Sequence, residues 1–171
     1  MRRAGLIVAL VALLGMLVGT TASPALAAGR GGPWTYNPAG DFTIPAGDCP
    51  FDVAVTQQGM VKTFEKGVKA PDGAAAVLIN GVADFTFTAN GKTITTRDSG
   101  NVVQTFYPDG SFTAVQHGNA FVGLPADVAG QFGFPAVFVS TGKLTISIDA
   151  SGNFSITLDG HILVDICAAL S

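Results

Sequence analysis

Two histidines are the residues of this sequence best suited to acid–base or metal chemistry. His117 and His161 are its only imidazoles, and an imidazole can exchange a proton near neutral pH or bind a metal ion. His161 and Asp165 would share one face of a strand, but they would stand ~13 Å apart along it, too far for a hydrogen bond. A metal site would also need His117, which is expected at a strand end, where a solvated histidine is common. We therefore expect no metal site.

No motif in the sequence indicates a catalytic centre. The G-x-S-x-G elbow of serine hydrolases is absent, as are the phosphate-binding, dinucleotide and calcium loops. Paired carboxylates could cleave glycosides, but the aspartates in question stand at or beside predicted turns, where turn geometry alone favours Asp. They are Asp98, Asp109, Asp149 and Asp159. We predict that the protein is not an enzyme, has no catalytic residues and needs no cofactor.

Cys49 and Cys167 are the only cysteines, one near each end of the chain that remains after export. An even pair in an oxidising compartment is expected to form a disulfide. Two isolated cysteines with no nearby histidine make a poor zinc site. We predict a Cys49–Cys167 disulfide that joins the first and last strands of the domain.

The N-terminus has the order of a secretory signal peptide. Arg2 and Arg3 precede an apolar stretch at residues 6–18, and the small-x-small sequence at residues 25–27 suits cleavage. The apolar stretch is shorter than the ~20 residues of a membrane-spanning helix. We expect residues 1–27 to be removed and the remainder to be secreted without a membrane anchor.

The composition excludes two classes of partner. Losing Arg2 and Arg3 from the 9 basic residues leaves 7 against 12 acidic ones, a net charge of −5. This charge disfavours nucleic acids, whose phosphates need a basic face, and it disfavours an anionic membrane surface. With 48% hydrophobic and 12% charged residues, the chain is expected to fold.

Residues 28–40 are rich in Gly and Pro and predict a flexible leader before the folded domain, residues 41–171. Trp34 and Tyr36 lie in this leader. They could hold a partner or a sugar, but we favour the interpretation that they fold back over an open sheet edge.

Apolar and polar residues alternate in five segments after residue 41, which predicts strands with one buried face. The apolar members are Phe51, Val53 and Val55; Phe85 and Phe87; Leu144, Ile146 and Ile148; Phe154, Ile156 and Leu158; and Ile162, Val164 and Ile166.

Turn signals separate these segments. Asn90-Gly91 predicts a tight hairpin, and Pro108-Asp109-Gly110 and Ser151-Gly152-Asn153 predict two further turns. Asp159-Gly160 is expected to open the final strand. The pattern predicts an all-β domain, an antiparallel meander of about eight to ten strands, and it favours a barrel over a sandwich.

Two segments depart from this pattern. Residues 124–135 are apolar without alternation, and we expect a helical turn after Pro125 that either plugs one end of a barrel or covers a cavity as a lid. Lys62, Lys66 and Lys69 form a basic cluster whose expected role is to protect an edge strand from pairing with other chains.

The two ends of the domain carry a resemblance. Cys49-Pro50-Phe51-Asp52 at one end and Asp165-Ile166-Cys167-Ala168-Ala169-Leu170 at the other resemble a group of small exported proteins of actinobacteria with no known activity. The resemblance implies an exported β-rich domain and supports the pairing of Cys49 with Cys167.

The sequence leaves two kinds of function open. The first is a monomeric, secreted binding module in which a β-barrel lined with Phe holds a small apolar ligand. The alternative is a structural or cell-surface protein that contacts a cell-wall component and has no small-molecule ligand. The residues that would bind a ligand cannot be assigned from the sequence.

Overall fold

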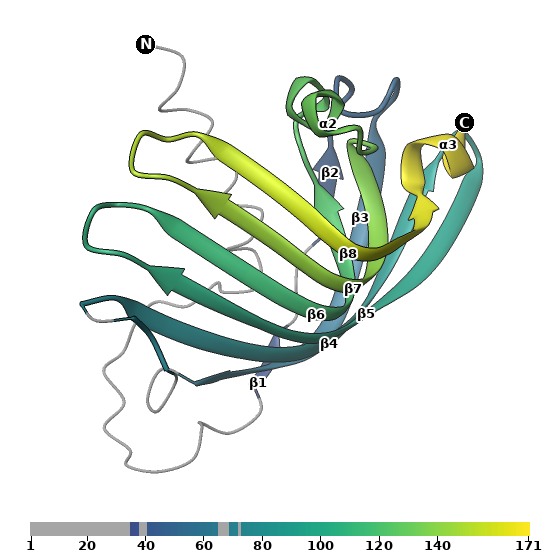
Figure 1. Cartoon of the computed structure of the whole chain (residues 1–171). Helices are drawn as coiled ribbons and strands as arrows, with labels where there is room; N and C mark the ends of the chain where they lie inside the picture. Colours follow the sequence, from purple (N-terminus) through teal and green to yellow (C-terminus); the bar gives the residue numbers. More distant parts are fainter. Residues whose placement is uncertain (1–34, 38–40, 65–68, 72) are drawn as a thin grey trace.

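The computed structural model describes residues 35–37, 41–64, 69–71 and 73–171 (Figure 1). The predicted signal peptide, residues 1–27, lies outside the described residues, as do Trp34 and Lys66.

One antiparallel sheet of eight strands forms the domain, in the order β1-β3-β4-β5-β6-β7-β8, with β2 also paired to β3. The strands are β1 (Thr35–Asn37), β2 (Phe42–Ile44), β3 (Val53–Phe64), β4 (Ala75–Ala89), β5 (Lys92–Phe106), β6 (Phe112–Gly123), β7 (Val137–Ile148) and β8 (Phe154–Asp165). This arrangement confirms the predicted all-β class and the meander. The short β1 belongs to the predicted leader and pairs with the edge of β3.

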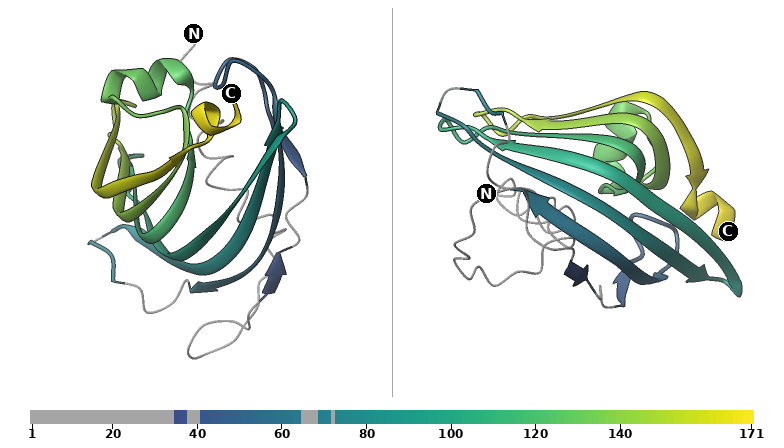
Figure 2. Two further views of the ribbon diagram at one scale, coloured as in Figure 1. Left: turned by 90° about the vertical axis from the view of Figure 1, so that its right-hand side faces the viewer. Right: turned by 90° about the horizontal axis from the view of Figure 1, so that it is seen from below.

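The sheet is open, so the expected barrel is not supported. In the described part of the chain β8 pairs only with β7, and the curved sheet leaves a gap between its two edges (Figure 2). The sheet also forks between β5 and β6. Strands β5 and β6 pair from Phe106↔Phe112 to Ser99↔Asn119, and beyond that point β5 stays with β4 while β6 stays with β7.

A row of glycines crosses the sheet where its long strands bend. Gly100 of β5 lies opposite Gly81 of β4 and Gly118 of β6, and Gly142 lies opposite both Gly118 and Gly160. A side chain has no room here, because a Cβ on Gly118 would overlap the Ser99 carbonyl oxygen of the neighbouring strand.

These glycines correct two predictions from the sequence. His117 and Asp159 were expected beside strand ends, but both lie inside continuous strands next to the glycine row. A glycine in a strand can mark a close backbone approach and a bend as readily as a turn. Several predicted short strands are therefore halves of longer, bent ones.

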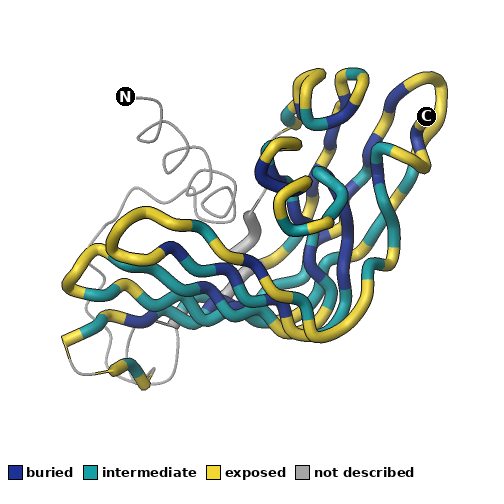
Figure 3. The backbone as a smooth tube through the Cα atoms, turned by 45° about the horizontal axis from the view of Figure 1, so that its top comes forward, coloured by how far each residue is buried: buried dark blue, intermediate teal, exposed yellow. Residues whose placement is uncertain are grey.

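The fork divides the sheet into two arms, one made of β3, β4 and β5 and the other of β6, β7 and β8. The larger hydrophobic core, here called the α3 core, lies between these arms. Helix α3 (Ile166–Leu170) follows β8 and buries Ile166 and Leu170 completely in this core. Buried side chains from β3, β4 and β7 surround the helix. In Figure 3 the buried positions run along the facing strands of both arms.

The predicted disulfide is present between Cys49 and Cys167, with 5.3 Å between the Cα atoms. The prediction that the bond joins the first and last strands is wrong, because Cys49 lies between β2 and β3 and Cys167 lies in α3. The disulfide therefore ties the two arms of the open sheet through α3.

Phe87 is the best position to test the α3 core. Its side chain is completely buried and packs against the rings of Phe85 and Phe121, with centroids 6.0 Å and 5.2 Å away. We expect Phe87→Ala to lower the free energy of unfolding by about 3–5 kcal/mol, through lost burial and a residual cavity. Urea denaturation measures the change. Thr88→Ala, on the exposed neighbour, should stay within about 0.5 kcal/mol of the parent, and a similar loss in both variants would contradict this account.

A second core, here called the α2 core, lies on the inner, concave face of β6, β7 and β8. Helix α2 (Ala126–Phe132) begins directly after Pro125, as predicted, and ends at Gly133 with φ 71°. Leu124 and Ala129 are buried against this face, and Phe132 meets Phe154 edge to face at 5.5 Å. The segment thus covers part of the concave face.

The alternation predicted for the last strand ends at Ile162. Ser140 pairs with Ile162 and Val139 with Val164, so Leu163 is an extra residue between them. This irregularity leaves Leu163 49% exposed and moves Val164 to the α3 core while Ile162 stays in the α2 core. A β-bulge changes the face of every residue after it.

Candidate functional site

Asp98 lies at the base of the fork and is the most unusual polar residue described. The sequence placed it beside a turn, but it is inside β5. Its Oδ2 accepts a hydrogen bond of 3.0 Å from the Phe121 backbone N–H. Since β5 and β6 separate at this level, a side-chain carboxylate takes the place of a backbone carbonyl as the acceptor.

Two amide side chains extend this arrangement across the fork. Gln116 Nε2 donates to Asp98 Oδ1 at 3.4 Å and to the Asn119 carbonyl at 3.3 Å. Asn119 Nδ2 donates to the Arg97 carbonyl at 3.3 Å. We call Asp98, Gln116 and Asn119 the fork cluster. The cluster joins β5 to β6 where their backbones begin to part.

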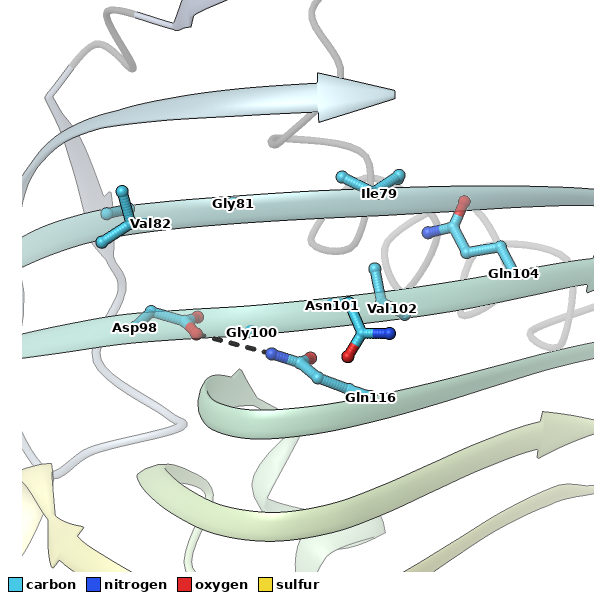
Figure 4. A pocket seen from close by; sticks show the side chains of 10 residues that line it. Ile79, Gly81, Val82, Asp98, Gly100, Asn101, Val102, Gln104 and Gln116 are labelled. Atoms are coloured by element: carbon cyan, nitrogen blue, oxygen red, sulfur yellow. Dashed lines mark hydrogen bonds between the residues drawn. The ribbon is translucent and has the colours of Figure 1, made fainter. Parts of the chain in front are cut away.

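A hollow on the concave face lies in front of the fork cluster, with a cavity volume of ≈ 40 Å³. At about 10–15 Å³ for one water, it would hold about three water molecules. Ile79, Ala83 and Val102 give it apolar walls, Asp98, Gln104 and Gln116 give it polar side chains, and Val82 and Asn101, whose side chains alternate to the other face of the sheet, also border it (Figure 4). Gly81 and Gly100 of the glycine row also line it. The bend of the sheet therefore forms the hollow.

Burial raises the pKa of Asp98 from 3.8 to about 6, although hydrogen bonds from the Phe121 and Ser99 backbones oppose the shift. Among the residues that the structure describes, no cation is paired with this carboxylate. In the described ranges the one ion pair joins Arg97 to Asp84 at 3.7 Å, and both of those side chains are more than half exposed. Asp98 is therefore a largely desolvated carboxylate without a counter-ion in the described part of the chain.

The negative charge of Asp98 should lower the free energy of unfolding at neutral pH. The pKa of Asp98 is higher in the folded than in the unfolded state. Its favourable contribution to the free energy of unfolding is therefore greatest below pH 3.8 and is lost as the pH rises towards about 6. The Asn oxygen of Asp98→Asn can still accept the Phe121 N–H without carrying a charge. At pH 8 we expect this variant to be more stable than the parent by about 1–3 kcal/mol.

Urea denaturation at pH 8 and pH 4 tests this expectation. The difference between Asp98→Asn and the parent should shrink at the lower pH, because Asp98 is then largely neutral in the folded state. Asp84→Asn, at an exposed site, should stay within about 0.5 kcal/mol of the parent. A destabilised Asp98→Asn protein at pH 8 would show that the charge supports the fold. Residues retained at a cost to stability are typical of functional sites.

The histidines do not form a site with Asp165. His117 and His161 are exposed on β6 and β8, opposite Lys143 and Thr141 respectively. The Asp165 carboxylate instead accepts the Ala168 N–H at 3.0 Å and caps α3. Over the described ranges no three His, Cys, Asp or Glu side chains gather as a metal site would require.

The turn role predicted for two aspartates is confirmed. Asp109 Oδ1 accepts from Ser111 N and Oγ at 2.9 Å and 2.6 Å, and these hydrogen bonds, the side-chain one first, lower its pKa. Asp149 accepts from the Asn153 backbone at 2.8 Å, and the Asn153 hydrogen bonds lower its pKa. Asp159 is different, because it lies within β8 opposite Lys143.

The basic cluster is only partly described. Lys62 lies in β3 opposite Asn80, and Lys69 is exposed. Both β1 and β2 pair along β3. The proposed protection of an edge by these lysines stays a prediction.

One signal in the sequence could have placed Asp98 correctly. It stands four residues after Ile94 and four before Val102, and a spacing of four puts all three on one face of a strand. That face is the inner one, which Val102 shares with Ile79. Aspartate is common in turns, and this association concealed the periodicity.

No family model, curated protein or solved structure matches the chain. The resemblance to small actinobacterial exported proteins therefore stays a prediction. No helix among the residues placed by the structure is long and apolar enough to cross a membrane.

Proposed function

We propose that the protein is a secreted, non-enzymatic binding domain that holds a small, largely apolar molecule on the concave face of its open sheet. The observation that supports this proposal most directly is the hollow beside Asp98 and Gln116, where apolar walls surround a few polar groups. Small-molecule sites commonly combine such walls with a few polar groups that orient the ligand. The disulfide is compatible with an oxidising, extracellular environment.

The proposed ligand extends beyond the hollow, which is too small for a whole organic molecule. Apolar residues continue along the same face towards the far ends of the strands. There Phe112 pairs across the strands with Phe106 and with Ile148, which in turn pairs with Phe154. The Phe106 and Phe112 rings lie 5.2 Å apart, and Phe106 is 45% exposed. We call these four residues the apolar rim; Ile148 is buried and Phe154 packs against Phe132, so Phe106 is the exposed member that offers a surface for the rest of the ligand.

Adjacent valines on β5 allow a matched test of this surface. Val102 faces the hollow, whereas Val103 points to the opposite face of the sheet. Native mass spectrometry and thermal shift with the secreted protein and apolar extracts should detect a bound molecule. Val102→Trp should abolish this binding by filling the hollow, and Val103→Trp should retain it.

Two results would contradict the proposed function. One is the absence of any bound molecule from the parent protein with all extracts tested. The other is equal binding by folded Val102→Trp and Val103→Trp, with circular dichroism establishing that both variants fold.

A further inference from the structure

We propose that the molecule bound at the concave face is an amphiphile carrying a protonated amine, with its ammonium group beside the Asp98 carboxylate. This inference rests on the proposed function and specifies the chemical class of the ligand. It follows from the unused acceptor capacity of Asp98, the charges around it and the apolar surface that leads away from it.

The Asp98 carboxylate retains capacity for another donor. An ionised carboxylate offers about four lone-pair sites. The Asp98 carboxylate accepts hydrogen bonds from the Phe121 N–H at 3.0 Å and from Gln116 at 3.4 Å, a long contact, and the Ser99 backbone also hydrogen-bonds to it. The remaining acceptor capacity is available to a ligand in the hollow, which Asp98 lines.

The charges favour a cation over an anion or a neutral head. Arg97, the next residue along β5, is engaged with Asp84 at 3.7 Å. The turns next to the apolar rim carry Asp109 and Asp149, whose lowered pKa values keep them ionised. A carboxylate ligand would place a second negative charge beside Asp98 in an apolar environment, where like charges repel strongly. An ammonium group would supply the missing counter-ion.

The direction of the apolar surface indicates a single flexible tail. Gln116 and Phe112 lie four residues apart on the same face of β6, so ~13 Å separates the fork cluster from the apolar rim. Ala114, between them, is buried beside Val102 and Ile79. In the proposed complex an alkyl chain would run along this face from Asp98 towards Phe112, beyond the residues that line the hollow.

Three amphiphiles with the same tail and different heads test the inference: decylamine, decanol and decanoate. Titration calorimetry on the secreted protein at pH 8, below micelle-forming concentrations, would measure their affinities. We expect decylamine to bind at least about tenfold more tightly than decanol, since charge-assisted hydrogen bonds are about twice as strong as neutral ones. Decanoate should bind most weakly.

The Asp98→Asn variant tests the assigned contact. In this variant decylamine and decanol should bind with affinities within about twofold of each other, because the counter-ion is gone. The preference for the amine should persist in Asp84→Asn, which removes an exposed negative charge instead. This comparison separates a contact with Asp98 from a general attraction of amines to an acidic protein.

The outcomes distinguish the inference from the proposed function. If decanol binds as tightly as decylamine, or if Asp98→Asn keeps the preference for the amine, the ammonium assignment is wrong. Binding of decanol that Val102→Trp abolishes would still support the proposed function in that case. If none of the amphiphiles or extracts binds to the parent protein, both proposals fail.

Discussion

Replacing both cysteines, in Cys49→Ala/Cys167→Ala, should lower the free energy of unfolding by about 4–5 kcal/mol, the loop-closure value for a chain of this separation. The bridged residues are 118 positions apart, so the bond removes much freedom from the unfolded chain. In the folded state it ties α3 to the segment before β3, across the gap in an open sheet. Among the described residues β8 does not pair with β3, so no hydrogen bonds between these strands can take over this role.

Urea denaturation of the oxidised parent and the double variant measures this effect. Adding a reductant should lower the stability of the parent to that of the double variant and leave the double variant unchanged. If the parent and the double variant agree within about 1 kcal/mol, the packing of Ile166 and Leu170 holds α3 without the bond. That result would exclude the proposed role of the disulfide in holding the arms together.

The second large effect is expected at the glycine row. Gly118→Ala should destabilise the protein by about 3 kcal/mol or more, which is in the range of strained backbones and overpacked cores. Gly118 has a φ of +107°, and a Cβ there would overlap the Ser99 carbonyl oxygen. To relieve the overlap, β5 and β6 must separate next to the fork cluster.

Gly130→Ala is the matched control, because the residue change is the same. A Cβ on Gly130 meets nothing within 4 Å, and Gly130 lies inside α2. There the change should be neutral or stabilise the protein by about 0.5–1 kcal/mol. Comparable stability of Gly118→Ala and Gly130→Ala by urea denaturation would show that the bend tolerates a side chain.

The glycine row connects the fold to the proposed site. Gly81 and Gly100 line the hollow beside Asp98, and the bend that they permit brings the two halves of β5 around it. The position of the hollow therefore depends on residues with no side chain.

Much of the fold was predictable from the amino-acid sequence. The alternation around Phe85 and Phe87 identified a strand with a buried face, and both residues are almost completely buried. Asn90-Gly91 predicted a tight hairpin, and both residues have positive φ, 52° and 72°. The pairing of Cys49 with Cys167 was also predicted correctly. These features depend on local periodicity, local backbone preference or a single pair of identical residues.

Only the tertiary structure decided whether the sheet closes and where Asp98 lies. Closure depends on hydrogen bonds between strands far apart in the sequence, and periodicity within each strand says nothing about them. A glycine produces the same local signal in a turn and in a bent strand, so Gly160 was misplaced. Asp98 was misplaced for a similar reason, because its burial arises from the separation of β5 and β6, a property of the pairing and not of either strand alone.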